Sequence, residues 1–342
     1  MRDRATGDIR VIVARAPGRV NLIGDHTDYT GGLVLPMAID RWTEVRGERR
    51  GLQVMLRSAD VDEPAAVPLD VEEPRLVEPH WARYVAGVVA EMRPAVGFEG
   101  TVSTTIPIGS GLSSSAALEV AVAWALGVEG APLDVARICQ SAERQASGVP
   151  CGIMDQLASA GGVEGAALLI DCRALTITPI ALPDDIEIVV VDSGEHRALA
   201  SSVYADRVRA CAQAEEQIGP LRDAKIEAVY EIADPQVRAC ARHVISENER
   251  VDWFSRAIGA RAFHDAGLMM DDSHASLRDD YQVSTPALER CVDDLRALPG
   301  VFGARLTGAG FGGCVVALTE RGAVRDTGWV VRPVAGATVI EE

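Results

Sequence analysis

The chain has 342 residues, with 33 Lys and Arg against 50 Asp and Glu, which gives a formal net charge of −17 at pH 7. This acidic balance argues against a surface that coats nucleic acid or adheres to anionic lipid, although a local site can still bind a small anion. Hydrophobic residues make up 48% and charged residues 24%, as in a folded globular protein, and the length allows two domains.

The sequence also bears on where the protein acts. No apolar run approaches the ~20 residues that span a bilayer, and the charged start lacks the pattern of a signal peptide. The seven cysteines are widely spaced without a CxxC pair, which disfavours a zinc ribbon or a disulfide framework. We expect a cytoplasmic protein without membrane or nucleic-acid partners, present as a monomer or weak dimer.

The predicted elements mix strands and helices without a regular βαβ alternation, which indicates an α+β protein. A weakly marked boundary near residue 184 divides the chain into domains 1–184 and 185–342. Apolar patterns predict strands at 9–14, 33–39, 100–106, 166–171, 186–191 and after residue 313. Helical spacing predicts helices at 81–92, from the serines at 113–115 to Gly127, at 133–147, at 203–218, and in several pieces over 234–298.

A cluster of polar residues lies in the glycine-rich stretch 15–32, between apolar flanks. Residues in loops carry function more often than residues in the core. Aspartate and histidine side chains in such a loop suit hydrogen bonding to a polyhydroxylated ligand, whereas the alternative is a solvated turn. The candidates are Arg19, Asn21, Asp25, His26, Asp28 and Tyr29.

A glycine- and serine-rich loop at residues 109–115 precedes an apolar predicted helix. Glycines let the backbone approach a ligand closely, and the first N–H groups of a helix favour an anion. The segment therefore suits a phosphate site, although no Walker A lysine follows. The alternative is an ordinary loop with a serine helix cap.

Asp155 is the one acid in an apolar and small-residue stretch at 149–157. Phosphoryl transfer to a hydroxyl needs an acid that orients the hydroxyl or accepts its proton, and a cation for the developing charge. Asp155 and Arg19 could supply both functions. The alternative from the pattern is that Asp155 caps a helix starting at Gln156.

A second glycine-rich loop fits GxGxxG at Gly308, Gly310 and Gly313. A dinucleotide site needs a helix after such a loop, but an apolar strand pattern follows here. We therefore expect a structural turn, or a backbone wall beside a phosphate or sugar.

The stretches at 15–29, 107–117 and 306–314 together resemble the GHMP kinases, and within them the galactokinases. Further similar segments lie in the same order at 150–156, 168–173, 199–204 and 273–281. The resemblance implies a two-domain fold with a ribosomal-S5-like N-terminal domain and a ferredoxin-like C-terminal domain. It also implies phosphorylation of the anomeric hydroxyl of galactose, with ATP and Mg²⁺.

The resemblance further assigns roles by position. Asp155 would be the catalytic carboxylate and Arg19 its cationic partner, and Ser115 and Glu143 would hold Mg²⁺. The sugar would contact Asp25, His26, Asp28, Gly152 and Tyr204. The nucleotide would contact Gly109, Ser110, Gly111, Leu112, Ser113, Ser114, Ser115 and Trp81, the last of which could instead be a core residue.

Two positions depart from the family pattern. Asp25 stands where galactokinases usually have Glu, and His196-Arg197 reverses the usual order. One methylene less draws a carboxylate back by about a bond length, enough to lose a hydrogen bond beyond ~3.5 Å. A kinase for N-acetylgalactosamine, arabinose or a uronic acid is therefore one alternative. A sugar sensor without activity is another, although residues 115–117 and Asp155 match the active pattern.

Overall fold

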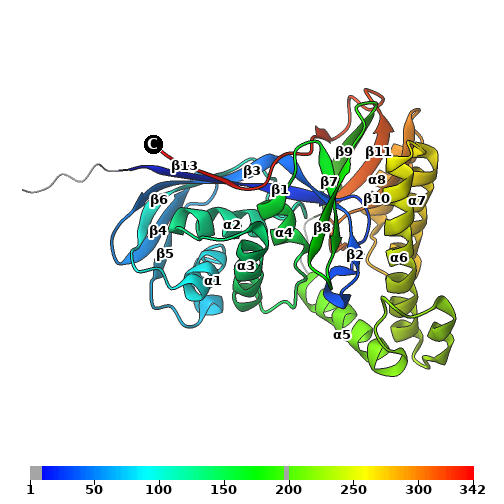
Figure 1. Cartoon of the computed structure of the whole chain (residues 1–342), viewed down its shortest axis with the longest axis horizontal. Coiled ribbons are helices and arrows are strands. Elements are labelled where there is room, and N and C mark those ends of the chain that lie inside the picture. Colours follow the sequence, from blue (N-terminus) through cyan, green and yellow to red (C-terminus); the bar gives the residue numbers. More distant parts are fainter. Residues whose placement is uncertain (1–9, 196–199) are drawn as a thin grey trace, which may run out of the picture.

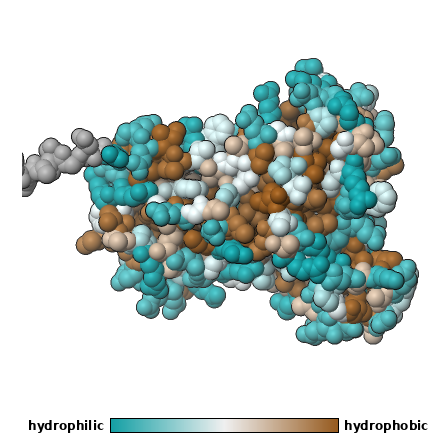
Figure 2. Space-filling view, in the orientation of Figure 1, coloured by the Kyte–Doolittle hydropathy of each residue, from teal (hydrophilic) through white to brown (hydrophobic). Residues whose placement is uncertain are grey.

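The computed structural model describes residues 10–195 and 200–342. Figure 1 shows one sheet with helices against it and, beside it, a second sheet with longer helices on its outer side. Figure 2 shows hydrophilic residues over much of one face, whereas apolar residues gather near its middle. Among the described residues, no helix combines the length and apolar character needed to cross a bilayer.

The first sheet runs in the order β13-β1-β3-β6-β4-β5. Its neighbouring strands are antiparallel except for β4 and β6, which are parallel. Because β13 comes from the C-terminus and pairs with β1, both ends of the described chain meet in this sheet (Figure 1). The strands are β1 (Ile12–Asn21), β3 (Pro36–Arg49), β4 (Gln53–Ser58), β5 (Ala65–Pro68), β6 (Phe98–Thr104) and β13 (Thr338–Glu341).

Helices cover one side of this sheet, and α2 packs directly against β1 and β3. Most residues of α2 are apolar and buried, as expected for a helix surrounded by protein, and Gly127 ends it in the left-handed conformation. The helical segments are η1 (Asp28–Thr30), η2 (Pro74–Leu76), α1 (Ala82–Met92), α2 (Ser114–Leu126), α3 (Pro132–Ser147) and α4 (Met154–Gly161).

The second sheet runs in the order β10-β11-β9-β12 and is antiparallel. Helices α7 and α8 pack on β10, and the Asp234 side chain caps α6. The strands are β9 (Ile186–Asp192), β10 (Val301–Leu306), β11 (Cys314–Glu320) and β12 (Trp329–Val331). The helices are α5 (Ala200–Ile218), η3 (Ile226–Glu231), α6 (Pro235–Gly259), α7 (Phe263–Asp279) and α8 (Pro286–Arg296).

A third sheet, in the order β2-β7-β8, lies between the two larger ones (Figure 1). Its strands are β2 (Leu33–Val34), β7 (Ala166–Asp171) and β8 (Thr176–Ala181). One continuous apolar cluster joins Leu22 and Met37 of the first half to Phe254 and Val316 of the second. The two halves therefore share a core, which fixes the geometry of any site between them.

The predicted α+β class is confirmed, and the helices predicted at 81–92 and 133–147 are confirmed to within one residue at their starts. The strand predicted at 9–14 is instead β1, which continues to Asn21, so part of the expected polar loop is strand. The boundary near residue 184 stays a prediction. Strand β9, which begins at Ile186, lies in the second sheet, whereas β13 returns to the first.

Candidate active site

A cavity of about 630 Å³ lies where the turn after β1 (residues 22–32, the signature turn), the first glycine-rich loop, α3, α4 and α5 meet. Its size is typical of small-molecule sites. Both glycine-rich loops border it, together with the polar cluster from the start of the chain. Among the predicted site residues, those that border it are Arg19, Asp25, His26, Asp28, Trp81, Gly109, Gly111, Ser113, Ser114, Ser115, Glu143, Gly152, Asp155 and Tyr204.

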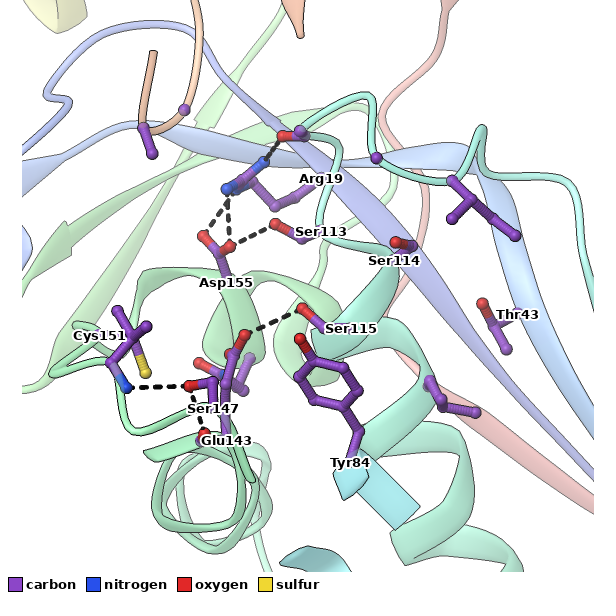
Figure 3. A pocket seen from close by; sticks show the side chains of 18 of the residues that line it. Arg19, Thr43, Tyr84, Ser113, Ser114, Ser115, Glu143, Ser147, Cys151 and Asp155 are labelled. Carbon is purple, nitrogen blue, oxygen red and sulfur yellow. Dashed lines mark hydrogen bonds and ion pairs between the residues drawn. The ribbon is translucent and has the colours of Figure 1, made fainter. Parts of the chain in front are cut away.

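The central contact in this cavity joins Arg19 on β1 to Asp155 on α4 (Figure 3). Arg19 Nε and Nη2 donate to the two carboxylate oxygens of Asp155 at 2.8 and 2.7 Å, and the Ser113 hydroxyl donates to the same carboxylate. The Arg19 side chain is 5% exposed and that of Asp155 is 29% exposed. The arginine thus anchors a carboxylate that still faces the cavity.

The helix-cap alternative for Asp155 does not hold. Asp155 is the second residue of α4, and in the described chain the preceding N-cap residue, Ile153, makes no side-chain capping bond. The carboxylate therefore serves the Arg19 and Ser113 contacts rather than the end of the helix.

The first glycine-rich loop leads into the N-terminus of α2. Gly109 and Gly111 have φ of +79° and +83°, values that favour glycine. Arg19 holds the loop in place, since its backbone N–H donates to Leu112 O at 3.1 Å and its Nη1 to Gly111 O at 2.7 Å. Within the described residues, Ser113 at the N-cap bonds Asp155 rather than capping the helix, which leaves the helix N-terminus available for phosphate oxygens.

Two residues of the predicted nucleotide set lie elsewhere. The Ser110 hydroxyl donates to Pro107 O at 2.7 Å, and the Leu112 side chain is buried in the shared core. Neither is among the described residues that border the cavity. Any contact of these two residues with a phosphate would therefore come from the backbone.

Ser115 and Glu143 meet beside the start of α2, where the Ser115 hydroxyl donates to Glu143 Oε1 at 3.0 Å (Figure 3). Burial raises the pKa of Glu143 to about 7, with a further contribution from the charge of Asp155. A hydroxyl and a carboxylate oxygen are ligands that Mg²⁺ accepts, and a cation would relieve the cost of an ionised Glu143. These two side chains therefore fit the metal that the resemblance implies.

Behind this pair lies a buried polar group that the sequence analysis missed. Gln156 Nε2 donates to Glu143 and also to Glu119 Oε2 at 3.2 Å. Glu119 on α2 is fully buried, which raises its pKa well above the ordinary value. An acid in the otherwise apolar helix pattern was the available signal for it.

The turn after β1 places Asp28 opposite Gly152. A Cβ atom on Gly152 would overlap Asp28 Oδ2, so only glycine leaves room for this carboxyl group. Burial raises the pKa of Asp28 to about 7, and the nearby charge of Asp155 adds to the shift. A partly protonated carboxyl group can both donate to and accept from a hydroxyl.

His26 sits in the same turn with φ of +67°, an unusual value for a residue with a side chain. Burial lowers its pKa well below the ordinary value, so the ring is neutral. Its Nδ1 lies 3.1 Å from the Tyr29 hydroxyl, while its buried Nε2 makes no hydrogen bond of ordinary geometry within the described chain. Tyr204 on α5 packs against the ring, with centroids 5.6 Å apart.

Asp25, by contrast, is held by protein groups. Its carboxylate accepts from Arg305 Nη2 at 2.5 Å and from the backbone N–H of Gly308 at 3.0 Å. Arg305 was not among the predicted site residues, although a charge inside the apolar pattern of 301–306 could have indicated it. Gly308 and Ala309 line the cavity beside this turn, which supports the expected backbone wall.

Trp81 borders the cavity, as do Tyr84 and Thr43, and its indole N–H donates to Glu63 O at 3.0 Å. Its ring also packs against the core of the first half. Both expectations for Trp81, the adenine contact and the core residue, therefore stay open. The reversed pair His196-Arg197 lies outside the described residues.

Comparisons with known proteins match the same segments. The galactokinase galactose-binding signature matches residues 4–48, and the GHMP kinase N-terminal and C-terminal domains match residues 83–162 and 254–327. Galactokinase from Roseiflexus sp. (strain RS-1) is 43% identical over 336 residues, covering 92% of this chain and 84% of that protein. Human galactokinase is 41% identical over 331 residues, covering 91% and 84%.

Solved structures agree with these matches. The crystal structure of Lactococcus lactis galactokinase complexed with galactose superposes with a TM-score of 0.88 at 31% identity, covering 96% of this chain and 95% of that one. Methanococcus jannaschii mevalonate kinase shares the fold, with a TM-score of 0.68 at 20% identity and coverage of 96% and 99%. The two-domain fold expected from the resemblance is confirmed.

Proposed function

This chain belongs to the galactokinases of the GHMP kinase family, and from that premise we propose that it transfers the γ-phosphoryl group of ATP to the anomeric hydroxyl of galactose. The observation that carries the proposal is the contact of Arg19, Asp155 and Ser113 at the N-terminus of α2, in one cavity with the signature turn.

The chemistry follows from the partners of Asp155. Any carboxylate is a far weaker base than the alkoxide of a sugar hydroxyl, so early removal of the hydroxyl proton is unfavourable. In a loose phosphoryl-transfer transition state, the hydroxyl becomes acidic only as its bond to phosphorus forms. Asp155 therefore orients the hydroxyl and accepts its proton late, while Arg19 fixes the carboxylate and adds positive charge beside the transferred group.

The phosphate end uses the free N–H groups of α2 and the serine hydroxyls at its start. Ser115 and Glu143 would hold Mg²⁺, which neutralises charge on the phosphate oxygens when it is bound. The sugar end uses Asp28 and the neutral His26 ring as hydrogen-bonding groups, with Tyr204 as an apolar wall.

A panel of sugars with ADP release as the readout tests the proposal. We expect the highest kcat/KM for galactose, and little turnover of N-acetylgalactosamine, arabinose or galacturonate. Turnover of one of these sugars without turnover of galactose would assign a different substrate. An enzyme preparation that binds ATP but turns over none of them would contradict the proposal.

A further inference from the structure

Arg305 is the largest fully buried side chain among the described residues, and it lies on β10 between apolar neighbours. An arginine is seldom buried completely unless its charge is paired and its donors are used. Its position therefore calls for a reason beyond packing.

The contacts of Arg305 converge on the turn that follows β1. Nη2 pairs with Asp25 Oδ2 at 2.5 Å and lies 3.8 Å from Glu247 Oε1 on α6. Nη1 donates to Leu22 O at 3.2 Å, and its distance to Asn21 O is 3.4 Å. One guanidinium thus holds both the backbone and the acid of this turn.

Asp25 is fixed from further sides. Its second carboxylate oxygen accepts from the backbone N–H of Gly308 at 3.0 Å, and its backbone oxygen lies 3.1 Å from His243 Nε2. The Asp25 side chain is 2% exposed. Both oxygens of the carboxylate are therefore engaged by the protein, and the buried side chain presents little surface to a sugar hydroxyl.

The pairing also joins two walls of the cavity. Asp25 and His26 come from the signature turn, whereas Gly308 and Ala309 come from the second glycine-rich loop, and all four border the cavity. These loops are separated by about 280 residues of chain, and the Asp25 carboxylate bridges them directly. Removal of the bridge would let the two walls move independently.

We propose that Arg305 is a positioning residue for the sugar end of the site, and that Asp25 acts by joining Arg305 to Gly308 rather than as the main acceptor of a sugar hydroxyl. The proposal rests on the proposed sugar-kinase function. It predicts that removing either charge alone raises KM for galactose more than removing both charges together does.

A double-mutant cycle with D25N, R305M and the double variant D25N/R305M tests this. Each single change leaves a buried charge unpaired, so we expect KM for galactose to rise about tenfold or more. In the double variant both charges are absent, and we expect KM within about fivefold of the wild type rather than the hundredfold product. We expect kcat and KM for ATP to change less than about threefold.

R296M is the matched control. Arg296 pairs with Asp271 at 2.7 Å and donates to Ala304 O, next to Arg305 on β10, and it is not among the described residues bordering the cavity. We expect a lower melting temperature with KM for galactose unchanged. R305K keeps the positive charge but loses the forked geometry of the guanidinium, and it replaces R305M in the test if R305M does not fold. For R305K we expect KM for galactose to rise about fivefold.

The outcomes separate this inference from the proposed function. Two results would overturn this inference alone if the wild type phosphorylates galactose. One is that the effects of D25N and R305M on KM for galactose multiply in the double variant; the other is that KM of the double variant is no lower than that of D25N. So would equal losses of galactose and ATP affinity in R305K. A wild-type enzyme inactive with every sugar would contradict the proposed function and this inference together.

Discussion

The substitution Asp155→Asn tests the proposed chemistry most sharply. Three donors converge on this carboxylate: Nε and Nη2 of Arg19 and the hydroxyl of Ser113. An asparagine keeps the shape but replaces one accepting oxygen by an NH₂ group, so a donor then faces a donor. The negative charge that balances the buried Arg19 is also lost.

The expected loss in rate follows from the role given to the carboxylate. A group that orients the hydroxyl and accepts its proton contributes typically about 10²–10⁴-fold to the rate. Loss of one charge-assisted hydrogen bond to Arg19 also removes about 1.5–3 kcal/mol of the free energy that holds the two side chains in place. We therefore expect kcat to fall about 10³-fold or more, equivalent to ~4 kcal/mol of transition-state stabilisation.

Steady-state ADP release measures kcat, and calorimetric titration measures galactose and ATP binding separately. We expect binding of both ligands to survive in part. D171N is the control, because Asp171 forms a similar pair with Arg222 at 2.5 Å but is not among the described residues that border the cavity. A kcat for D155N within tenfold of the wild type would refute the assigned role.

Three further predictions concern the sugar and metal sites. Gly152→Ala places a Cβ on the Asp28 carboxyl, so KM for galactose should rise at least tenfold in kinetic assays, with kcat changed less. Burial raises the pKa of Asp28 to about 7 in the native state, well above its unfolded value. As the pH rises from 4 to 7 the carboxyl group ionises mainly in the unfolded state, so the stability of the native state falls. D28N should therefore melt above the wild type at pH 7, and this difference should shrink toward pH 4; a constant difference would contradict the shift. Glu143→Gln replaces the charged carboxylate beside the Ser115 hydroxyl by a neutral amide, so the Mg²⁺ concentration for half-maximal activity should rise. An unchanged Mg²⁺ titration would show that Glu143 does not hold the metal.

Local patterns predicted much of the fold, because short-range periodicity determines amphipathic helices such as α1 and α3. The pairing of β13 with β1 was not predictable in this way. It joins residues more than 300 positions apart, and β13 is a short, exposed strand with no distinctive pattern.

The candidate site shows the same division. Local patterns and the resemblance of separate segments both indicated Arg19, Asp155 and the serines, and the structure places them in one cavity. The pairing of Asp25 with Arg305 was not predictable, because an acid in a polar loop and an arginine in a strand give no signal of contact across 280 residues. Tertiary contacts of this kind decide whether a polar side chain faces a ligand or the protein.

The most direct test of the account is the identity of the product. We predict that incubation with galactose and MgATP gives a ³¹P resonance coupled to the anomeric proton, with the coupling pattern of an α-1-phosphate. A phosphate ester on any other hydroxyl, or ATP hydrolysis without a sugar phosphate, would contradict the placement of the anomeric hydroxyl at Asp155.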